Sequence, residues 1–190
     1  MPQNKGMVQI VIDLDNLEDT IERIYEQYYL DVYKFLVSFT GNQSDAEDLT
    51  QDVFIRVLKS LPKFNEHYKL KTWVLSIAKH TAIDHFRKKK FYSLFEDNFF
   101  KQLLSKEKQP DEIAENLEKR TEINTALTTL KPQYRMVFIL RGVNEYSIKE
   151  TAEIMDWSEA KVKVTYHRAL KKLKEELMGK SKGVLENANC

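Results

Sequence analysis

A run of basic side chains near the C-terminus is the clearest chemical feature of this sequence. Lysine and arginine recur from position 161 to position 174, and no acidic residue interrupts them. A helix with such a face suits a DNA groove, because its cations pair with phosphates and its first residues reach base edges. A solvent-exposed basic face would have the same composition, so the run alone leaves both interpretations open. The basic residues are Lys161, Lys163, Arg168, Lys171, Lys172 and Lys174.

The residues before this run predict a helix-turn-helix. Ser147 and Glu150 have the spacing of a capping box, which opens a short helix. Residues 156–158 then form a turn, and Ser158 caps a last helix that reaches about Met178. A capped short helix, a turn and a basic helix in this order favour DNA binding over a merely solvated surface.

A second basic cluster stands at the end of a helix predicted over residues 70–90. It is close in sequence to the aromatic residues Phe64, Tyr68 and Trp73. Cations beside aromatic rings suit single-stranded nucleic acid, since the cations follow the phosphates and the rings stack on bases. Two other interpretations stay open: cations offset the dipole at a helix C-terminus, and Trp73 fits an apolar core stripe. The polar members are Lys79, His80, Thr81, Asp84, Arg87, Lys88, Lys89 and Lys90.

A third set of residues lies on a helix predicted over residues 44–60. Ser44 and Glu47 have capping-box spacing, which makes Ser44 the predicted cap. Several apolar residues fall outside the inner stripe of this helix, which indicates a second used face and hence a protein interface. A larger local core or simple surface variation would give the same pattern. The interface candidates are Asp48, Gln51, Asp52, Phe54 and Arg56, with Ile55 and Leu58 as further apolar positions.

Signals for catalysis and metal binding are weak. The sequence has no glycine-rich phosphate loop and no metal-ligand spacing of cysteine and histidine. The single cysteine, Cys190, forms no intramolecular disulfide, which agrees with a reducing cytosol. The sequence contains no run of about 18 apolar residues, so it predicts no membrane span. We therefore expect a cytoplasmic binding protein that is not an enzyme and uses no cofactor, metal or small-molecule substrate.

Composition and periodicity predict an all-α fold of two small helical domains. Glycine and proline are scarce, with 5 and 4 copies, and apolar residues recur at helical spacing from Leu17 until Gly41 ends the first helix. The formal net charge of +1 points to no partner, so a nucleic-acid surface requires local clustering. The predicted order is an N-terminal domain over residues 17–90, a linker over 91–110, a helix-turn-helix domain over 111–178 and a polar tail over 179–190.

Three stretches, in this order, resemble the extracytoplasmic-function (ECF) sigma factors of the sigma-70 family. Asp45–Val57 resembles region 2.2, and Lys71–His80 with Asp84 and Arg87 resembles regions 2.3 and 2.4. Leu130–Arg135 together with Ser147–Leu173 resembles region 4. The resemblance extends over residues 17–178 and implies a sigma region 2 bundle joined by a linker to a sigma region 4 helix-turn-helix.

The resemblance implies a sigma factor that binds core RNA polymerase and directs promoter-specific transcription initiation, in a cell-envelope or other stress response. The implied partners are the polymerase β′ clamp and β flap, promoter DNA and a membrane-anchored anti-sigma factor. The implied polymerase-binding residues are Asp48, Gln51, Asp52, Phe54 and Arg56. The implied −10 residues are Phe64, Asn65, His67, Tyr68, Lys69, Trp73, Lys79, His80, Thr81, Asp84, Arg87 and Lys88. The implied −35 residues are Ser158, Lys161, Lys163, Val164, Thr165, His167, Arg168 and Lys171.

Some positions depart from the family pattern. His80 stands where many members carry asparagine, Ala160–Lys161 replaces the common Gly-Thr, and Leu170 stands where arginine is frequent. These positions belong to promoter reading, so the resemblance implies no promoter sequence. The alternative is a helix-turn-helix regulator with an unrelated helical N-terminal domain, which would have no need of the Asp45–Arg56 segment.

Overall fold

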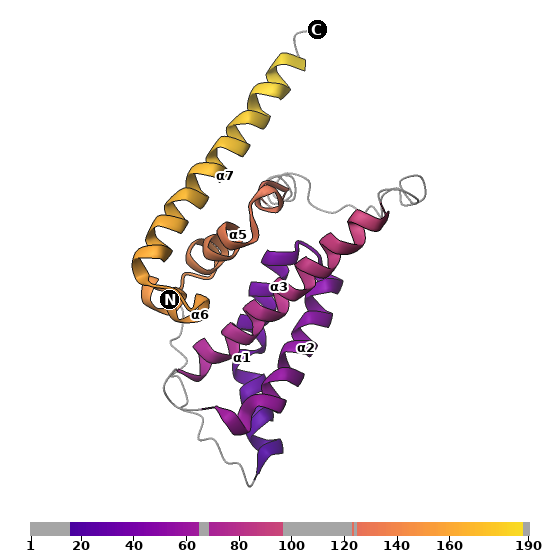
Figure 1. Ribbon diagram of the computed structural model, residues 1–190, viewed down its shortest axis with the longest axis vertical. Coiled ribbons are helices and arrows are strands. Elements are labelled where there is room, and N and C mark those ends of the chain that lie inside the picture. Colours follow the sequence, from indigo (N-terminus) through magenta and orange to yellow (C-terminus); the bar gives the residue numbers. More distant parts are fainter. Residues whose placement is uncertain (1–15, 65–68, 97–122, 124, 188–190) are drawn as a thin grey trace, which may run out of the picture.

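The computed structural model describes residues 16–64, 69–96, 123 and 125–187, and the side chains of these residues outside 90–96 and 179–187. Within these ranges the chain forms helices and no strand (Figure 1), which confirms the predicted all-α fold. The elements are α1 (Leu17–Thr40), α2 (Gln43–Ser60), the 3-10 helix η1 (Leu61–Lys63), α3 (Leu70–Glu96), α5 (Pro132–Phe138), the π-helix η2 (Ile139–Val143), α6 (Ile148–Met155) and α7 (Glu159–Asn187).

The helices α1, α2 and α3 form an N-terminal bundle. Ile24, Val32 and Leu36 recur at helical spacing along α1 and are fully buried in the core of this bundle. Gly41 ends α1 in the left-handed conformation, with a φ of 69°, and its N–H donates to the carbonyl of Val37 at 2.9 Å. Gly41 therefore stops α1 where the sequence predicts, and α2 begins almost at once.

The C-terminal domain contains helical residues 125–129 followed by α5, η2, α6 and α7. Pro132 opens α5 at a first-turn position, where its missing N–H costs no helical hydrogen bond. A small apolar cluster joins residues 125–130 to α7 through Leu127, Leu130 and Leu173. The second half of α7 extends away from the rest of the molecule (Figure 1).

The two domains pack against each other along α3. Met136, Ile154 and Met155 of the C-terminal domain belong to the same apolar cluster as the core of α1, α2 and α3. In Figure 1, α5 and α6 lie beside α3. The sequence predicts the two domains but not this shared core, because periodicity identifies an apolar face without identifying what covers it.

Three local predictions are wrong. The side chain of Asn42, and not of Ser44, caps α2 by accepting a hydrogen bond from the N–H of Asp45 at 2.8 Å. The third helix does not end at Lys90 but continues to Glu96, so part of the predicted linker 91–110 is helical. The last helix does not end near Met178 but continues to Asn187, which makes most of the predicted tail 179–190 helical. Residues 97–122 lie outside the described part of the chain.

Candidate nucleic-acid and protein interfaces

The helix-turn-helix is held by hydrogen bonds at both of its helix starts. The N–H of Glu150 donates to Ser147 Oγ at 3.1 Å, and the N–H of Ser147 donates to Glu150 Oε2 at 2.9 Å, which confirms the capping box. These bonds from Ser147 lower the pKa of Glu150. The turn passes through Asp156 in the left-handed conformation, and the N–H of Lys161 donates to Ser158 Oγ at 3.3 Å. The orientation of α7 is thus fixed by residues of the motif itself.

The predicted −35 residues lie almost entirely on the outer face of α7. Thr165 is the exception, since it is 9% exposed and turns inward beside the fully buried Val162. The Nζ of Lys161 lies 3.8 Å from the centre of the Trp157 ring, a cation–π contact that holds this lysine at the start of the helix. The exposed members are Ser158, Lys161, Lys163, Val164, His167, Arg168 and Lys171.

The predicted −10 residues on α3 are divided between exposed and buried positions. His80, Arg87 and Lys88 are exposed. Lys79 is only 5% exposed, and Thr81 is buried with its hydroxyl donating to the carbonyl of Ile77 at 3.0 Å. Neither buried residue can meet DNA in this arrangement.

Two of the aromatic residues predicted for the −10 surface, Phe64 and Trp73, lie in the described part of the chain. Trp73 is half-buried, and its ring lies 4.8 Å from that of Phe64, centre to centre. Lys69 is exposed at the start of α3. Asn65, His67 and Tyr68 lie outside the described residues.

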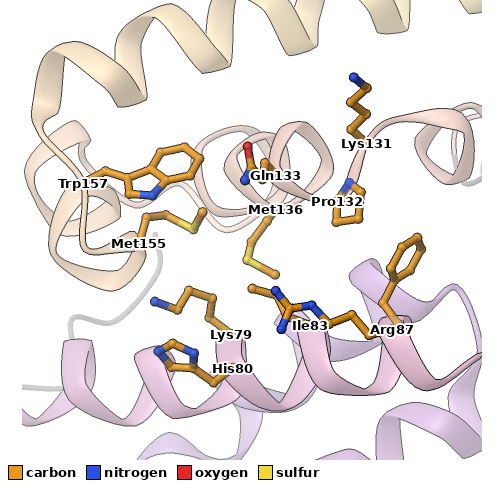
Figure 2. Close-up of a pocket in the computed structure, with 11 residues that line it drawn as sticks. Lys79, His80, Ile83, Arg87, Lys131, Pro132, Gln133, Met136, Met155 and Trp157 are labelled. Carbon is orange, nitrogen blue, oxygen red and sulfur yellow. The ribbon is translucent and has the colours of Figure 1, made fainter. Parts of the chain in front are cut away.

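Lys79 and His80 border a cleft between the two domains (Figure 2). The cleft has a volume of about 620 Å³, and none of its lining residues is acidic. Burial lowers the pKa of Lys79, which the charge of Asp156 partly opposes. Burial and the neighbouring Lys79 also lower the pKa of His80. The lining residues are Lys79, His80, Ile83, Phe86 and Arg87 from α3, Lys131, Pro132, Gln133 and Met136 from α5 and its cap, and Met155 and Trp157 from α6 and the turn.

The outer face of α2 combines acidic, amide and apolar side chains. Asp48, Gln51, Ile55 and Leu58 follow one another at helical spacing on this face, and Ile55 and Leu58 are 50% and 39% exposed. Phe54 instead belongs to the core, where its ring lies 4.8 Å from that of Tyr25. The apolar excess of this helix therefore has two destinations, a core position and an exposed patch.

Arg56 connects α2 to α3. Its guanidinium lies 3.2 Å from the carboxylate of Asp52 and 3.3 Å from that of Asp84, all three being about half exposed. Farther along the same pair of helices, Asp45 lies 3.0 Å from Lys89 and 3.5 Å from His85. Arg56 and Asp84, which belong to two different predicted sites, are therefore partners of each other.

Neither a metal site nor a membrane-spanning helix is found in the part of the chain that the structure describes. None of its clusters of histidine, cysteine, aspartate and glutamate could hold a metal ion. None of its helices is both long and apolar enough to cross a membrane.

Comparison with known proteins assigns both halves of the chain to one family. The family model for Sigma-70 region 2 matches residues 24–92, and that for Sigma-70 region 4 matches residues 120–173. The chain is 41% identical to the ECF RNA polymerase sigma factor SigX of Bacillus subtilis (strain 168), with 85% of each chain covered. It is 36% identical to the RNA polymerase sigma factor YlaC of the same organism, covering 84% of this chain and 92% of YlaC.

Two solved structures share the fold. One is the sigma factor RpoE in complex with the anti-sigma factor NepR from Bartonella quintana, with a TM-score of 0.63, 22% identity, and 83% of this chain and 96% of that chain covered. The other is CnrH in complex with the cytosolic domain of CnrY, with a TM-score of 0.64, 20% identity, and 85% and 90% covered.

Proposed function

This chain belongs to the ECF sigma factors of the sigma-70 family, and from that premise we propose which of its surfaces bind core RNA polymerase and which read promoter DNA. The protein is a transcription initiation factor that directs RNA polymerase to promoters. Its family consists of initiation factors and not of enzymes. The match of residues 24–92 to region 2 counts against a regulator with an unrelated N-terminal domain.

The outer face of α7 is proposed to read the −35 element. The supporting observation is the exposed, acid-free face from Lys161 to Lys174, presented by a helix whose start is fixed by Ser158 and by the capped α6. Lys163, Val164 and Arg168 face outward within the first turns, where a recognition helix meets base edges. Lys161 and Lys171 are placed to contact phosphates.

The exposed side of α3 is proposed to hold the −10 strand. His80, Arg87 and Lys88 lie along one stretch of this helix and can follow a phosphate backbone. Lys69 and Trp73 near the start of the helix would lie beside the unstacked bases. Lys79 and Thr81 would contribute only if their present surroundings change.

The outer face of α2 is proposed to bind the polymerase β′ clamp. Asp48 and Gln51 supply polar contacts, and the exposed Ile55 and Leu58 supply the apolar centre that a protein interface requires. Arg56 supports this face indirectly by joining α2 to α3 through Asp84. Phe54 supports it from the core.

The remaining assignments complete the proposal. Residues 17–90 form region 2, residues 91–110 the linker, whose first part continues α3 to Glu96, residues 111–178 region 4, and residues 179–190 a tail, most of which continues α7 to Asn187. Region 4 contacts the polymerase β flap, and the protein acts in the cytoplasm in a cell-envelope or other stress response. A membrane-anchored anti-sigma factor is proposed as a further partner, since RpoE was solved with the anti-sigma factor NepR and CnrH with the cytosolic domain of CnrY.

Binding to core polymerase tests the proposal at its foundation. We expect Asp48→Arg combined with Ile55→Asp to abolish capture of core polymerase by the tagged protein, because it reverses a charge and removes an apolar contact on exposed positions. Glu22→Arg combined with Leu30→Asp is the matched control: it makes the same charge reversal and the same apolar-to-acidic change at exposed positions of α1, outside the proposed interface, and should bind as wild type does. Equal capture of all three proteins would refute the α2 interface.

A further inference from the structure

The cleft between the two domains has the size and the lining of a small-molecule site. Its volume of about 620 Å³ falls within the roughly 300–1,000 Å³ of pockets that hold small ligands. Its walls are mainly apolar, formed by Met136, Met155 and Trp157 of the C-terminal domain and by Ile83 and Phe86 of α3. Methionine side chains and aromatic rings adapt well to a flexible apolar group. The body of a matching ligand is therefore apolar.

One buried cation lines this cleft without a partner. Lys79 is only 5% exposed, yet none of the hydrogen bonds and ion pairs among the described residues involves its ammonium group. Burial lowers the pKa of Lys79, and the charge of Asp156 opposes this effect only in part. Because an ammonium group is costly to bury without a partner, the cleft favours an occupant that brings a negative charge to Lys79.

The cations of the cleft stand towards its ends, with apolar side chains between them. Figure 2 shows Lys79 and His80 towards one end and Arg87 towards the other, with Met136 and Ile83 between. None of the residues that line the cleft is acidic, so nothing in the lining repels an anion. A ligand with one anionic head and an apolar chain matches this order, since its head meets Lys79 while its chain follows the apolar walls.

A nucleotide matches the cleft less well. A triphosphate carries several negative charges, whereas Lys79 is the one buried cation in the lining, and Arg87 and Lys131 are exposed to solvent. The sugar and the phosphates would also lie against apolar walls that offer them no hydrogen bonds. The charge and the lining thus favour a ligand with a single charge and a long apolar part.

We propose that the cleft binds a small amphiphile with a single carboxylate head and an unbranched acyl chain. The carboxylate pairs with Lys79, and the chain lies against Ile83, Met136 and Met155. A ligand in this position contacts α3 of one domain and α5 and α6 of the other, so it binds the packed domains and stabilises them by mass action. This site is separate from the question of which surfaces bind polymerase and promoter DNA.

Titration with decanoate, below the concentration at which it forms micelles, tests for the site. In full-length protein, Trp73→Phe leaves Trp157 as the single tryptophan, and its fluorescence reports occupation of the cleft that it lines. We expect a saturable change with one decanoate bound per chain, and a raised melting temperature. Affinity should fall by about fourfold for each methylene removed, from decanoate to octanoate to hexanoate. A change that does not saturate, or no change, would overturn the proposal.

The pairing of the carboxylate with Lys79 is tested from both sides. Decanol keeps the chain without the charge, and Lys79→Met keeps the length of the side chain without the cation. Each change alone should weaken binding about tenfold, and the two together should weaken it no further, because they remove the same ion pair. Lys34→Met, which removes an exposed cation of α1, is the matched control and should bind decanoate as wild type does.

Two results would contradict this pairing. If Lys79→Met binds decanoate as tightly as wild type and Lys34→Met do, the carboxylate does not meet Lys79. If Lys79→Met loses affinity for decanol and decanoate equally, the substitution acts on the shape of the cleft and not on the charge. Either result overturns the proposal.

A competition experiment separates the amphiphile from a nucleotide. We expect ATP to leave the fluorescence of Trp157 and the affinity for decanoate unchanged. Displacement of decanoate by ATP would assign the cleft to a nucleotide and would overturn the proposed ligand. These titrations need neither polymerase nor promoter DNA, so their failure would leave the proposed sigma-factor surfaces standing, and failure to capture core polymerase would leave this site standing.

Discussion

The two helices proposed to read DNA, α3 and α7, are presented in opposite ways. The reading face of α7 points outward and is positioned by bonds within the motif, from Ser147, Glu150 and Ser158. The corresponding face of α3 is partly covered by the other domain, with Lys79 buried. One reading surface is thus complete as folded, while the other depends on where its neighbour lies.

This difference also determines how much each helix contributes to the stability of the fold. The covered face of α3 contributes apolar burial to the packing of the two domains, so it stabilises the fold. The exposed face of α7 contributes little to stability, because its lysines and arginine are solvated. Substitutions on the two helices should therefore have different consequences for stability and for DNA binding.

The largest effect is expected where the two domains are fastened. Arg135→Met should lower the free energy of unfolding by about 3 kcal/mol, because it removes the three hydrogen bonds that the buried guanidinium donates to the carbonyls of Leu127, Thr128 and Phe39. Arg135→Lys should not restore the loss, since one ammonium group cannot reach all three acceptors in the geometry of a guanidinium fork. Urea denaturation followed by circular dichroism measures both.

Arg23→Met is the control for this change. Arg23 forms an exposed pair with Asp19 at 2.8 Å, so its loss should cost only about 0.3 kcal/mol. If Arg135→Met and Arg23→Met unfold at the same urea concentration, the buried guanidinium does not hold the domains together.

A second pair of substitutions compares the reading surfaces themselves. In the free protein, Arg168→Ala should weaken binding of duplex DNA by about 1–3 kcal/mol if it contacts a base edge, whereas Lys79→Ala should leave binding unchanged because its ammonium group is covered. In the holoenzyme both substitutions should weaken promoter binding. Fluorescence anisotropy at fixed salt, with a duplex selected by the wild-type holoenzyme, gives all four values.

Equal weakening of DNA binding by Lys79→Ala and Arg168→Ala in the free protein would contradict the difference between α3 and α7. It would mean that the side chain of Lys79 is already accessible before polymerase binds. A loss for Arg168→Ala in both states, with none for Lys79→Ala in either, would remove Lys79 from the −10 surface.

The local parts of this architecture could be predicted from the sequence. The caps at Ser147 and Ser158 and the end of α1 at Gly41 depend on partners three or four residues away, so short patterns determine them. The cap of α2 shows where such patterns fail. Ser44 and Glu47 matched the capping box, but Asn42 lies two residues earlier with extended backbone and takes that role. Short motifs thus compete, and the sequence alone does not rank them.

Which of the predicted site residues are accessible depends on packing between distant parts of the chain, and local sequence patterns do not reveal this packing. The pairing of Arg56 with Asp84 joins residues of two helices, and the cover over Lys79 comes from Trp157 and its neighbours in the other domain. The apolar excess on α2 correctly indicated an exposed patch at Ile55 and Leu58, but Phe54 entered the core. Side-chain types therefore identified the candidate surfaces, and only the fold shows which members are accessible.

The smallest expected effect concerns the pH dependence of the capping box formed by Ser147 and Glu150, which supports α6 and, through the turn, the start of α7. Glu150→Gln keeps a hydrogen-bond acceptor but removes the charge, so it should destabilise the protein by about 0.5 kcal/mol at pH 7. The bonds from Ser147 hold the pKa of Glu150 below 4.5 in the folded state, so this contribution is fully present above 4.5 and is lost as pH falls through the lowered pKa. The difference in unfolding free energy between wild type and variant should therefore shrink below pH 4.5 and vanish in stronger acid. If the difference in unfolding free energy instead stays constant as the pH falls well below 4.5, the charge of Glu150 has no part in the cap. The helix-turn-helix would then be held by Ser147 and Ser158 alone.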